Sequence, residues 1–294
     1  MLATDTSPSL KSSGNLVEGE FAFTSHDFRN IAAMLHADAG IALVESKANL
    51  VYSRLAKRLR ILGIGSFKDY CELVAGRDGV EERQQMLVSL TTNVTRFFRE
   101  EHHFTHLKSK VLPKLIERVR HGGRARIWSA GCSSGQEPYS IALTLLSLMP
   151  DAGRFDIKIL ASDIDSNVVA QGREGAYSAD VCSPIPNDLL TRWFTRNDRE
   201  GWVANPDLRD LISFRELNLM GTWPMRHAFD VIFCRNVAIY FEEETQARIW
   251  NRFASVLSPG GSLYIGHSER VMGEAANKLI TDGLTTYRLK GAVS

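Results

Sequence analysis

Residues 128–138 read WSAGCSSGQEP, a glycine-rich turn between two segments of different periodicity. The preceding Ile127–Ala130 predicts a buried strand, and Pro138 suits the first turn of a helix that continues to Met149. Small residues in such a turn let a ligand approach the backbone at the carboxyl end of a strand. The stretch therefore predicts a cofactor loop in an α/β domain, although an ordinary strand-to-helix turn has similar glycines.

The segments after this loop alternate between strands and helices. Four further strands are predicted, at Ile157–Ser162, Phe229–Cys234, Ser262–Gly266 and Thr285–Leu289. A helix over Glu242–Leu257 separates the second of these from the third. This alternation is typical of a doubly wound, Rossmann-like parallel sheet. Prolines and glycines interrupt it from about residue 175 to 219, where we expect a small inserted antiparallel β subdomain.

The chain before residue 93 has a different pattern. Residues 1–20 contain few apolar positions and predict a loose tail. Residues 21–92 predict an all-helical N-terminal domain, with helices that start near Ser25, Ser46, Ser66 and Gly79. Residues 93–123 are expected to form a linker and a connecting helix, and residues 124–294 the sheet domain with its insertion.

The composition excludes several broad classes of protein. The chain has 294 residues, 44% of them hydrophobic, and a net charge of +1, so no global charge indicates a nucleic-acid or membrane partner. No apolar run reaches the roughly 20 residues that a membrane-spanning helix needs, and no signal segment is visible, so we expect a cytoplasmic protein. The cysteines are scattered without a C-x-x-C pair, which argues against a bound metal.

Two acids favour one kind of cofactor at the predicted loop. Glu137 stands where a dinucleotide's pyrophosphate would need only amide donors, and a carboxylate there favours the ammonium and sulfonium groups of S-adenosylmethionine. Asp163 ends the second strand, where an acid holds a ribose diol; capping a helix is its alternative role. The loop favours S-adenosylmethionine over NAD, and a nucleotide-dependent oxidoreductase is the rival within the same fold.

The other polar segments near the sheet contain no obvious nucleophile. Residues 233–240 read FCRNVAIY, without the Asn/Asp-Pro-Pro-aromatic stretch that is usual in enzymes that methylate bases. Residues 91–104 read TTNVTRFFREEHHF, and for Arg96, His102 and His103 we favour a role in an amphipathic helix between domains. A nucleic-acid methyltransferase is therefore disfavoured, and a non-catalytic sensor of S-adenosylmethionine stays open.

Five stretches together resemble the bacterial chemotaxis receptor glutamate methyltransferase family, CheR. They are residues 90–104, 127–140, 161–165, 232–241 and 266–269. The resemblance runs from about Phe23 to Leu289 and covers both predicted domains. One departure is in the loop, where residues 132–138 read CSSGQEP and keep only the second acid of the family's usual Gly-Glu-Glu-Pro. The resemblance implies that S-adenosylmethionine is contacted by Asn93, Thr95, Arg99, Glu137, Asp163, Asn218, Leu219, Arg235 and Asn236.

The activity implied by this resemblance is an S-adenosylmethionine-dependent O-methyltransferase. It would form glutamate methyl esters on the cytoplasmic domain of chemotaxis receptors and leave S-adenosylhomocysteine. Arg99 and Tyr240 are then the residues nearest the transferred methyl. A glutamate side chain has an ordinary pKa of about 4.3, so at neutral pH it is already a nucleophile and needs no general base. This chemistry explains the lack of a catalytic histidine or cysteine.

The resemblance also implies that the helical domain docks the acidic coiled coil of the receptor. Arg54, Lys57, Arg58 and Arg60 lie on one predicted helix and are the expected docking residues, although such a run is usually a solvated charged face. Some family members bind a pentapeptide tether at the receptor's carboxyl terminus through a Gly-x-Gly turn in the insertion. Residues 195–201 read TRNDREG, with one glycine, so we expect action without the tether.

Overall fold

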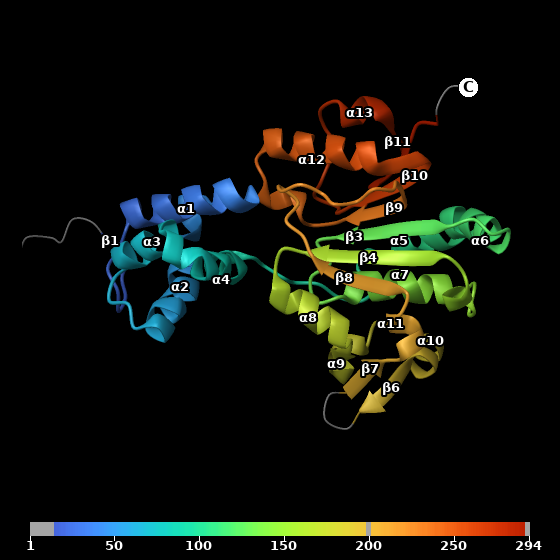
Figure 1. The fold of residues 1–294 in the computed structure, drawn as a ribbon, viewed down its shortest axis with the longest axis horizontal. Coiled ribbons are helices and arrows are strands. Elements are labelled where there is room, and N and C mark those ends of the chain that lie inside the picture. The colour runs from blue at the N-terminus through green and yellow to red at the C-terminus, as the bar shows by residue number, and fades with distance from the viewer. Residues whose placement is uncertain (1–14, 198–200, 292–294) are drawn as a thin grey trace, which may run out of the picture. The chain divides into compact units, whose positions relative to one another are not determined.

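The structure is a computed structural model that describes residues 15–197 and 201–291 (Figure 1). The chain forms two units, residues 1–90 and residues 91–294. This boundary falls next to the one that the sequence predicts at residue 92. In the described ranges, no helix is both long enough and apolar enough to cross a membrane.

Helices make up most of the first unit, and local signals fix their ends. The Thr24 hydroxyl accepts the Asp27 N–H at 3.2 Å while the Asp27 carboxylate accepts the Thr24 N–H at 2.9 Å, which caps the first helix one residue before the expected Ser25. Gly40 and Gly63 end the first two helices in the left-handed conformation. The elements are α1 (Ser25–Ala39), η1 (Glu45–Lys47), α2 (Ala48–Leu62), α3 (Phe67–Ala75), η2 (Arg77–Gly79) and α4 (Val80–Leu90).

The loose tail expected over residues 1–20 is wrong for its last residues. The short strand β1 (Asn15–Val17) pairs antiparallel with β2 (Phe23–Thr24). The Phe21 N–H donates to the Tyr52 hydroxyl of α2 at 3.1 Å, and the Glu20 carboxylate pairs with Arg60 at 2.8 Å. These contacts with α2 order a segment whose composition is polar. Residues 1–14 lie outside the described part of the chain.

A seven-stranded sheet organises the second unit, in the order β11-β12-β10-β9-β3-β4-β8. The five strands from β10 to β8 are parallel, and β12 and β11 add antiparallel pairs at one edge. In Figure 1, strands β10, β9, β3, β4 and β8 follow one another from top to bottom. The bounds are β3 (Ala125–Ala130), β4 (Ile157–Asp163), β8 (Ile212–Glu216), β9 (Phe229–Cys234), β10 (Leu257–Ile265), β11 (Leu279–Gly283) and β12 (Thr286–Leu289).

Helices pack against this sheet, and aromatic side chains fill the layer between them. The helix before β3 contacts β3, α7 contacts β4 and β8, and α12 contacts β10. The ring of Phe233 stacks on Phe104 at 5.8 Å and on Tyr264 at 4.2 Å. The bounds are α5 (Glu101–His106), the π-helical turn η3 (Leu107–Val111), α6 (Leu112–Arg120), α7 (Gln136–Leu146), η4 (Ala152–Arg154), α8 (Ser166–Glu174), η5 (Ala238–Tyr240), α12 (Glu243–Val256) and α13 (Ala275–Lys278).

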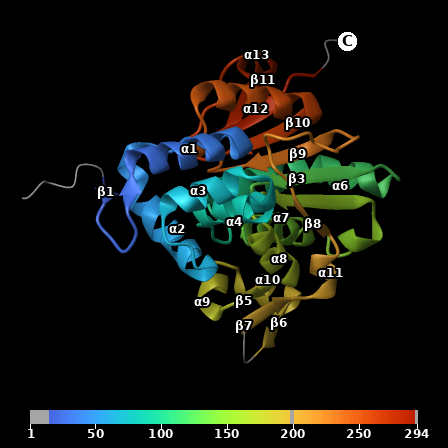
Figure 2. The ribbon, with the colours of Figure 1, turned by 60° about the vertical axis from the view of Figure 1, so that its left-hand side comes forward.

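The predicted insertion is present but shorter than expected. Its three-stranded antiparallel sheet has the order β5-β7-β6, and in both views it lies beyond β8, at the end of the unit opposite to α12 and α13 (Figures 1 and 2). Residues 212–216, expected in the insertion, instead form β8, which pairs with β4 of the main sheet. The elements are β5 (Ala176–Tyr177), α9 (Ala179–Cys182), α10 (Asn187–Trp193), β6 (Phe194–Asn197), β7 (Gly201–Ala204) and α11 (Pro206–Arg209).

Candidate active site

The carboxyl ends of the parallel strands bring most of the predicted cofactor residues to one edge of the sheet. Register pairs Ala130 of β3 with Ser162 of β4, and Asp163 of β4 with Glu216 of β8. The neighbouring β9 runs parallel to β3 and ends directly before Arg235. The predicted residues that meet at this edge are Glu137 with its loop, Asp163, Asn218, Leu219, Arg235 and Asn236.

The loop between β3 and α7 is held against β4. The N–H groups of Gly131 and Cys132 both donate to the Ser162 carbonyl, at 2.8 and 2.9 Å. Gly135 has φ +98°, and a Cβ there would lie 2.8 Å from the Tyr177 hydroxyl oxygen, so glycine is required. The small residues of the loop therefore allow its tight backbone turn and also leave room for a ligand.

Backbone N–H groups hold the Asp163 carboxylate in place at this edge of the sheet. Its Oδ2 accepts the Ser133 N–H at 2.8 Å, and its Oδ1 accepts the Asp165 N–H at 3.1 Å. Burial raises the pKa of Asp163, and these amide donors act in the opposite direction. The Ile164 amide is a third stabilising donor, and a carboxylate has about four acceptor positions, so about one remains for a hydroxyl of a ligand. Helix capping, the alternative role, belongs to Asp165, which accepts the Asn167 N–H at the start of α8.

The segment after residue 92 crosses the loop and carries three predicted residues, Asn93, Thr95 and Arg99. The Asn93 amide donates to Asp165 Oδ2 at 2.7 Å, and its carbonyl accepts the Ser133 hydroxyl at 2.9 Å. Arg99 Nη1 donates to the Val94 carbonyl at 3.1 Å. The segment is thus tied to both the β3 loop and the acidic turn after β4, which places Arg99 beside the same edge.

Arg235 lies at the centre of a buried charge cluster. Its Nη1 lies 3.3 Å from Glu137 Oε2, and its Nη2 lies 3.5 Å from Glu100 Oε2 and donates to the Arg99 carbonyl. Glu137 also accepts the Ser129 hydroxyl at 2.7 Å. The structure therefore presents Glu137 as a carboxyl already engaged with an arginine, a partner that the sequence does not indicate.

This cluster holds one guanidinium against two carboxyls. Burial raises the pKa of Glu137 despite Arg235, whereas Arg235 and His267 outweigh burial at Glu100 and lower its pKa. Burial lowers the pKa of the adjacent His103 to about 3, so that ring is neutral at pH 7. With both carboxyls ionised, Arg235 balances only one of them, and a bound cation can balance the other.

The same edge fits S-adenosylmethionine by its chemistry. The charge cluster can accommodate a cation, Asp163 has an acceptor position for a ribose hydroxyl, and the buried Asn236 Oδ1 has no hydrogen-bond partner among the described residues. A pyrophosphate would instead meet acidic side chains. These groups would hold the amino and ribosyl ends of the cofactor.

Comparison with known families decides between the classes of protein that the sequence leaves open: an oxidoreductase, a methyltransferase and a non-catalytic sensor. Residues 93–287 match the model described as CheR methyltransferase, SAM binding domain, and residues 26–91 match CheR methyltransferase, all-alpha domain. The chain belongs to the CheR methyltransferase family. Its cofactor is S-adenosylmethionine, and its activity is S-adenosylmethionine-dependent methylation in chemotaxis.

Individual relatives agree with this assignment over nearly their whole length. A probable chemotaxis protein methyltransferase of Rhizobium etli is 54% identical over 87% of this chain and 96% of its own. The chemotaxis protein methyltransferase of Escherichia coli is 39% identical over 91% and 92%. Among solved structures, the N-methyltransferase NodS of Bradyrhizobium japonicum covers 71% of this chain and 97% of its own at 14% identity, with a TM-score of 0.35, which is too low to support an argument.

Glu269 organises the CheR site although the sequence assigned it no role. Its two carboxylate oxygens accept four backbone N–H groups: those of Gly266 at 2.6 Å, Asn236 at 2.9 Å, Val237 at 2.9 Å and Ala238 at 2.7 Å. Asn236 is held with φ +60° as a result. The sequence signal that could have identified Glu269 is its position, three residues after Gly266, the glycine that follows β10. Glu269 joins the ends of β9 and β10 and so positions Arg235 and Asn236.

Replacing Glu269 with Gln should loosen this turn. The amide puts an NH2 group where a carboxylate oxygen accepts two N–H groups, at a cost of about 2–4 kcal/mol. We expect the melting temperature to fall and the Kd for S-adenosylmethionine, measured by calorimetry, to rise at least about tenfold. Glu274→Gln, at an exposed acid nearby, is the matched control and should change neither. An E269Q protein with wild-type Kd would show that Glu269 does not position the site.

Three other predicted residues have less defined surroundings. Asn218 Oδ1 accepts the Met220 N–H at 2.9 Å, and the Leu219 carbonyl accepts Trp223 Nε1 at 3.1 Å, so both belong to a turn after β8. Tyr240 ends the short helix η5, four residues after Asn236. These positions are compatible with the expected roles and leave those roles as proposals.

Glu100, His102 and His103 place metal-ligand atoms within 4.8 Å of one another. The Arg235 guanidinium lies 3.5 Å from the same carboxylate of Glu100, and Nε2 of His103 lies 2.8 Å from the Thr285 hydroxyl oxygen. A metal would have to bind beside a buried guanidinium, which disfavours it electrostatically. We assign no metal to this cluster. His103 is buried against Phe233 and Tyr264 inside the second unit, whereas the sequence favours a helix between domains for it.

The four expected docking residues all lie on α2 in the helical unit, but they are not equivalent. Arg58 makes two contacts with Glu82, at 3.0 and 2.5 Å, and its side chain is only 20% exposed. Arg54 donates to the Ser89 carbonyl at 3.2 Å. Lys57 and Arg60 are exposed, and Arg60 pairs with the equally exposed Glu20 at 2.8 Å. Arg58 and Arg54 therefore hold α2 against α4, and Lys57 and Arg60 are better placed to meet a partner.

Proposed function

We propose that this protein methylates glutamate side chains of a chemoreceptor cytoplasmic domain and forms methyl esters there. The observation that carries the proposal is the state of the ionisable groups at the site. Among the described residues, Glu137, Asp163 and Glu269 are engaged by amide, hydroxyl or guanidinium donors, and the neighbouring His103 has a pKa of about 3. The buried His103 is therefore unsuited to deprotonate an amine or hydroxyl, and a carboxylate acceptor needs no such base.

The chain's own residues would then have to place the carboxylate and shield it from water. Bound S-adenosylmethionine supplies an electrophilic methyl group on a cationic sulfur. Arg99 can orient an incoming carboxylate through its guanidinium, and Tyr240 can donate its hydroxyl. Arg235 and Glu269 keep the turn after β9 in place. Catalysis would rest on orientation and electrostatics.

The bond that is formed can be tested chemically. The protein is incubated with methyl-labelled S-adenosylmethionine and a purified chemoreceptor cytoplasmic fragment, and the product is treated with base. We expect the label to leave as volatile methanol, because a carboxyl ester is alkali-labile. Label that stays on the protein after base treatment would indicate N-methylation and refute the proposal.

We propose further that α2 docks the acidic receptor helix through Lys57 and Arg60, in the cytoplasm. Lys57→Glu/Arg60→Glu should raise the KM for the receptor fragment about tenfold, since exposed charge pairs contribute up to about 1 kcal/mol each and reversal adds repulsion. The control Lys68→Glu/Arg77→Glu changes two exposed cations elsewhere in the same unit. Equal KM values for the two variants would exclude α2 as the docking helix.

The receptor tether is not needed in this proposal. The insertion ends in the edge strand β6, which pairs with β7 on one side, and the three residues between these strands lie outside the described part of the chain. The support is the charged, single-glycine sequence of residues 195–201. Micromolar binding of a receptor tail peptide would refute it.

A further inference from the structure

A stripe of exposed cations follows the helix that leads away from the active site. Helices α5 and α6, with η3 between them, run from Glu101 to Arg120 and span about 30 Å at 1.5 Å per residue. The helix starts directly after Arg99 and Glu100 and ends before β3 begins, so it runs from the cofactor edge of the sheet to the opposite edge. We name the exposed cations here the α6 stripe: Lys108, Lys110, Lys114 and Arg120 of the helix, and Arg124 in the segment between α6 and β3.

The charge of this stripe is local and largely uncompensated. Residues 107–124 contain six Lys and Arg against the single acid Glu117, in a chain of net charge +1. Arg118 of the same helix pairs with Asp230 at 2.7 Å. For the stripe itself, the described residues provide no ion pair within 4 Å. A partner of opposite charge would therefore gain attraction here without breaking an existing pair.

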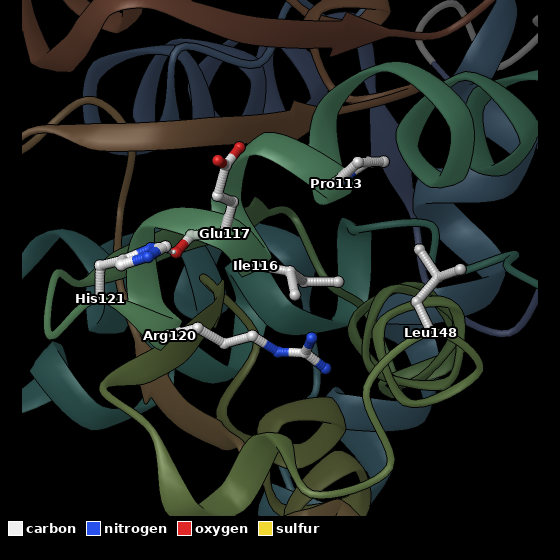
Figure 3. A pocket seen from close by; sticks show the side chains of 6 residues that line it. All are labelled: Pro113, Ile116, Glu117, Arg120, His121 and Leu148. Atoms are coloured by element: carbon white, nitrogen blue, oxygen red, sulfur yellow. Dashed lines mark hydrogen bonds between the residues drawn. The ribbon is translucent and has the colours of Figure 1, made fainter.

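A hollow with an apolar floor opens beside the stripe. Figure 3 shows Ile116 near the centre, with Pro113 and Leu148 on one side and Glu117, His121 and Arg120 around the rest. The hollow measures about 430 Å³. Ile116 is recessed, at 8% exposure, whereas Leu148 is 36% exposed on the rim. The surface combines a concave apolar site with exposed cations on and after the same helix.

The occupant that fits both features is an acidic amphipathic helix. Apolar side chains at helical spacing would enter the hollow, and flanking Asp or Glu side chains would meet the stripe. A bilayer is disfavoured because its anchoring would require protruding apolar side chains, and Ile116 is recessed. Single-stranded nucleic acid is disfavoured because Pro113, Ile116 and Leu148 offer no aromatic platform for bases.

We infer that the α6 stripe and its hollow form a second docking surface for the acidic helix of the receptor substrate. The inference rests on the proposed function for the identity of that helix. A glutamate held near Arg99 belongs to a helix that can continue along α5 and α6, because the stripe begins within ten residues of Arg99. The stripe would fix the direction in which the substrate helix lies.

The test uses Lys110→Glu/Lys114→Glu/Arg120→Glu in the full chain. We expect the KM for the receptor fragment to rise about tenfold and its salt dependence to weaken, with kcat at saturating receptor and the Kd for S-adenosylmethionine unchanged. The matched control Lys110→Arg/Lys114→Arg/Arg120→Lys keeps the charge and should behave as wild type. Leu148→Glu, at the rim of the hollow, should raise KM by itself, since it sets an acid against an acidic helix.

Direct binding of the receptor fragment, followed by fluorescence anisotropy, separates the two proposals. Binding that depends on the stripe without any methyl ester formation would reject the proposed function and keep the docking surface. Methyl ester formation with the same KM in the triple variant and its control would reject the docking surface and keep the function. Loss of binding to phosphatidylglycerol vesicles in the triple variant, with receptor binding unchanged, would also overturn the inference.

Discussion

Asp163→Asn should weaken binding of S-adenosylmethionine by about 10- to 100-fold. The Asp163 carboxylate accepts the N–H groups of Ser133 and Asp165, is also stabilised by the Ile164 amide, and keeps about one acceptor position for the ribose. A hydrogen bond to a charged group contributes about 1.5–3 kcal/mol, so losing one corresponds to about 10- to 100-fold in Kd. The Asn amide also sets an NH2 group against one of the two N–H groups. Isothermal calorimetry with S-adenosylmethionine measures the change.

The control for this variant is Asp230→Asn, at the opposite edge of the same sheet. Asp230 is also buried and accepts the Arg126 N–H at 2.9 Å and an Arg118 N–H at 2.7 Å. Both variants should lower the melting temperature by loss of similar bonds, but only Asp163→Asn should lose the cofactor. A Kd for Asp163→Asn within about threefold of the control would remove Asp163 from the ribose site.

Arg99→Ala should lower kcat about 100- to 1000-fold, the range seen when one electrostatic donor to a transition state is removed. The Arg99 side chain donates to the Val94 carbonyl, whereas its own carbonyl accepts from Arg235 and stays in the variant. The fold and the charge cluster should therefore survive. Steady-state kinetics at saturating cofactor and receptor gives the effect on kcat.

Arg96→Ala is the matched control, because Arg96 is an exposed arginine three residues earlier in the same segment. It should keep kcat within about twofold. If Arg99→Ala raised the Kd for S-adenosylmethionine with kcat unchanged, Arg99 would be a binding residue only. If both variants lost kcat equally, the segment's overall charge would matter and the specific role of Arg99 would be wrong.

The positions of the site residues follow from short-range sequence signals, but their partners do not. Asp163 can be placed because an acid ends a β-branched run, and the structure puts it at the carboxyl end of β4. Glu137 can be placed because it opens the helix after the glycine loop. Its partner Arg235 is 98 residues away, a pairing that only the parallel register of β3 and β9 creates. The sequence therefore suggests a free acid where the structure has an ion pair.

The fold errors have a similar cause. Residues 212–216 form a short strand with prolines and glycines before it, and nothing local shows that it pairs with β4 and not with the insertion. The strand β11 was not predicted, because Leu279–Gly283 alternates too weakly and is fixed by pairing with β12. Asn15–Val17 is held by contacts between its loop and α2, which a polar composition does not indicate. In all three cases, contacts with residues distant in the sequence determine whether the segment forms a strand and where that strand pairs.

The basic run on α2 shows how a charge pattern can be overinterpreted. Arg58 looks like a surface cation in the sequence, but Glu82 binds it and also accepts the Tyr70 hydroxyl at 2.8 Å. The Glu82 hydrogen bond raises the pKa of Arg58, as expected for a structural pair. Reversing Arg58 would damage the helical unit, so its loss of activity would say nothing about docking.

Mapping the methylated atom tests the central claim most directly. The protein is incubated with S-adenosylmethionine that carries a deuterated methyl group and with the receptor cytoplasmic fragment, and peptides of the fragment are sequenced by mass spectrometry. The account predicts the label on glutamate side chains, absent from a fragment in which those glutamates are replaced by alanine. Label on lysine, arginine, histidine or an amino terminus, and none on glutamate, would contradict it.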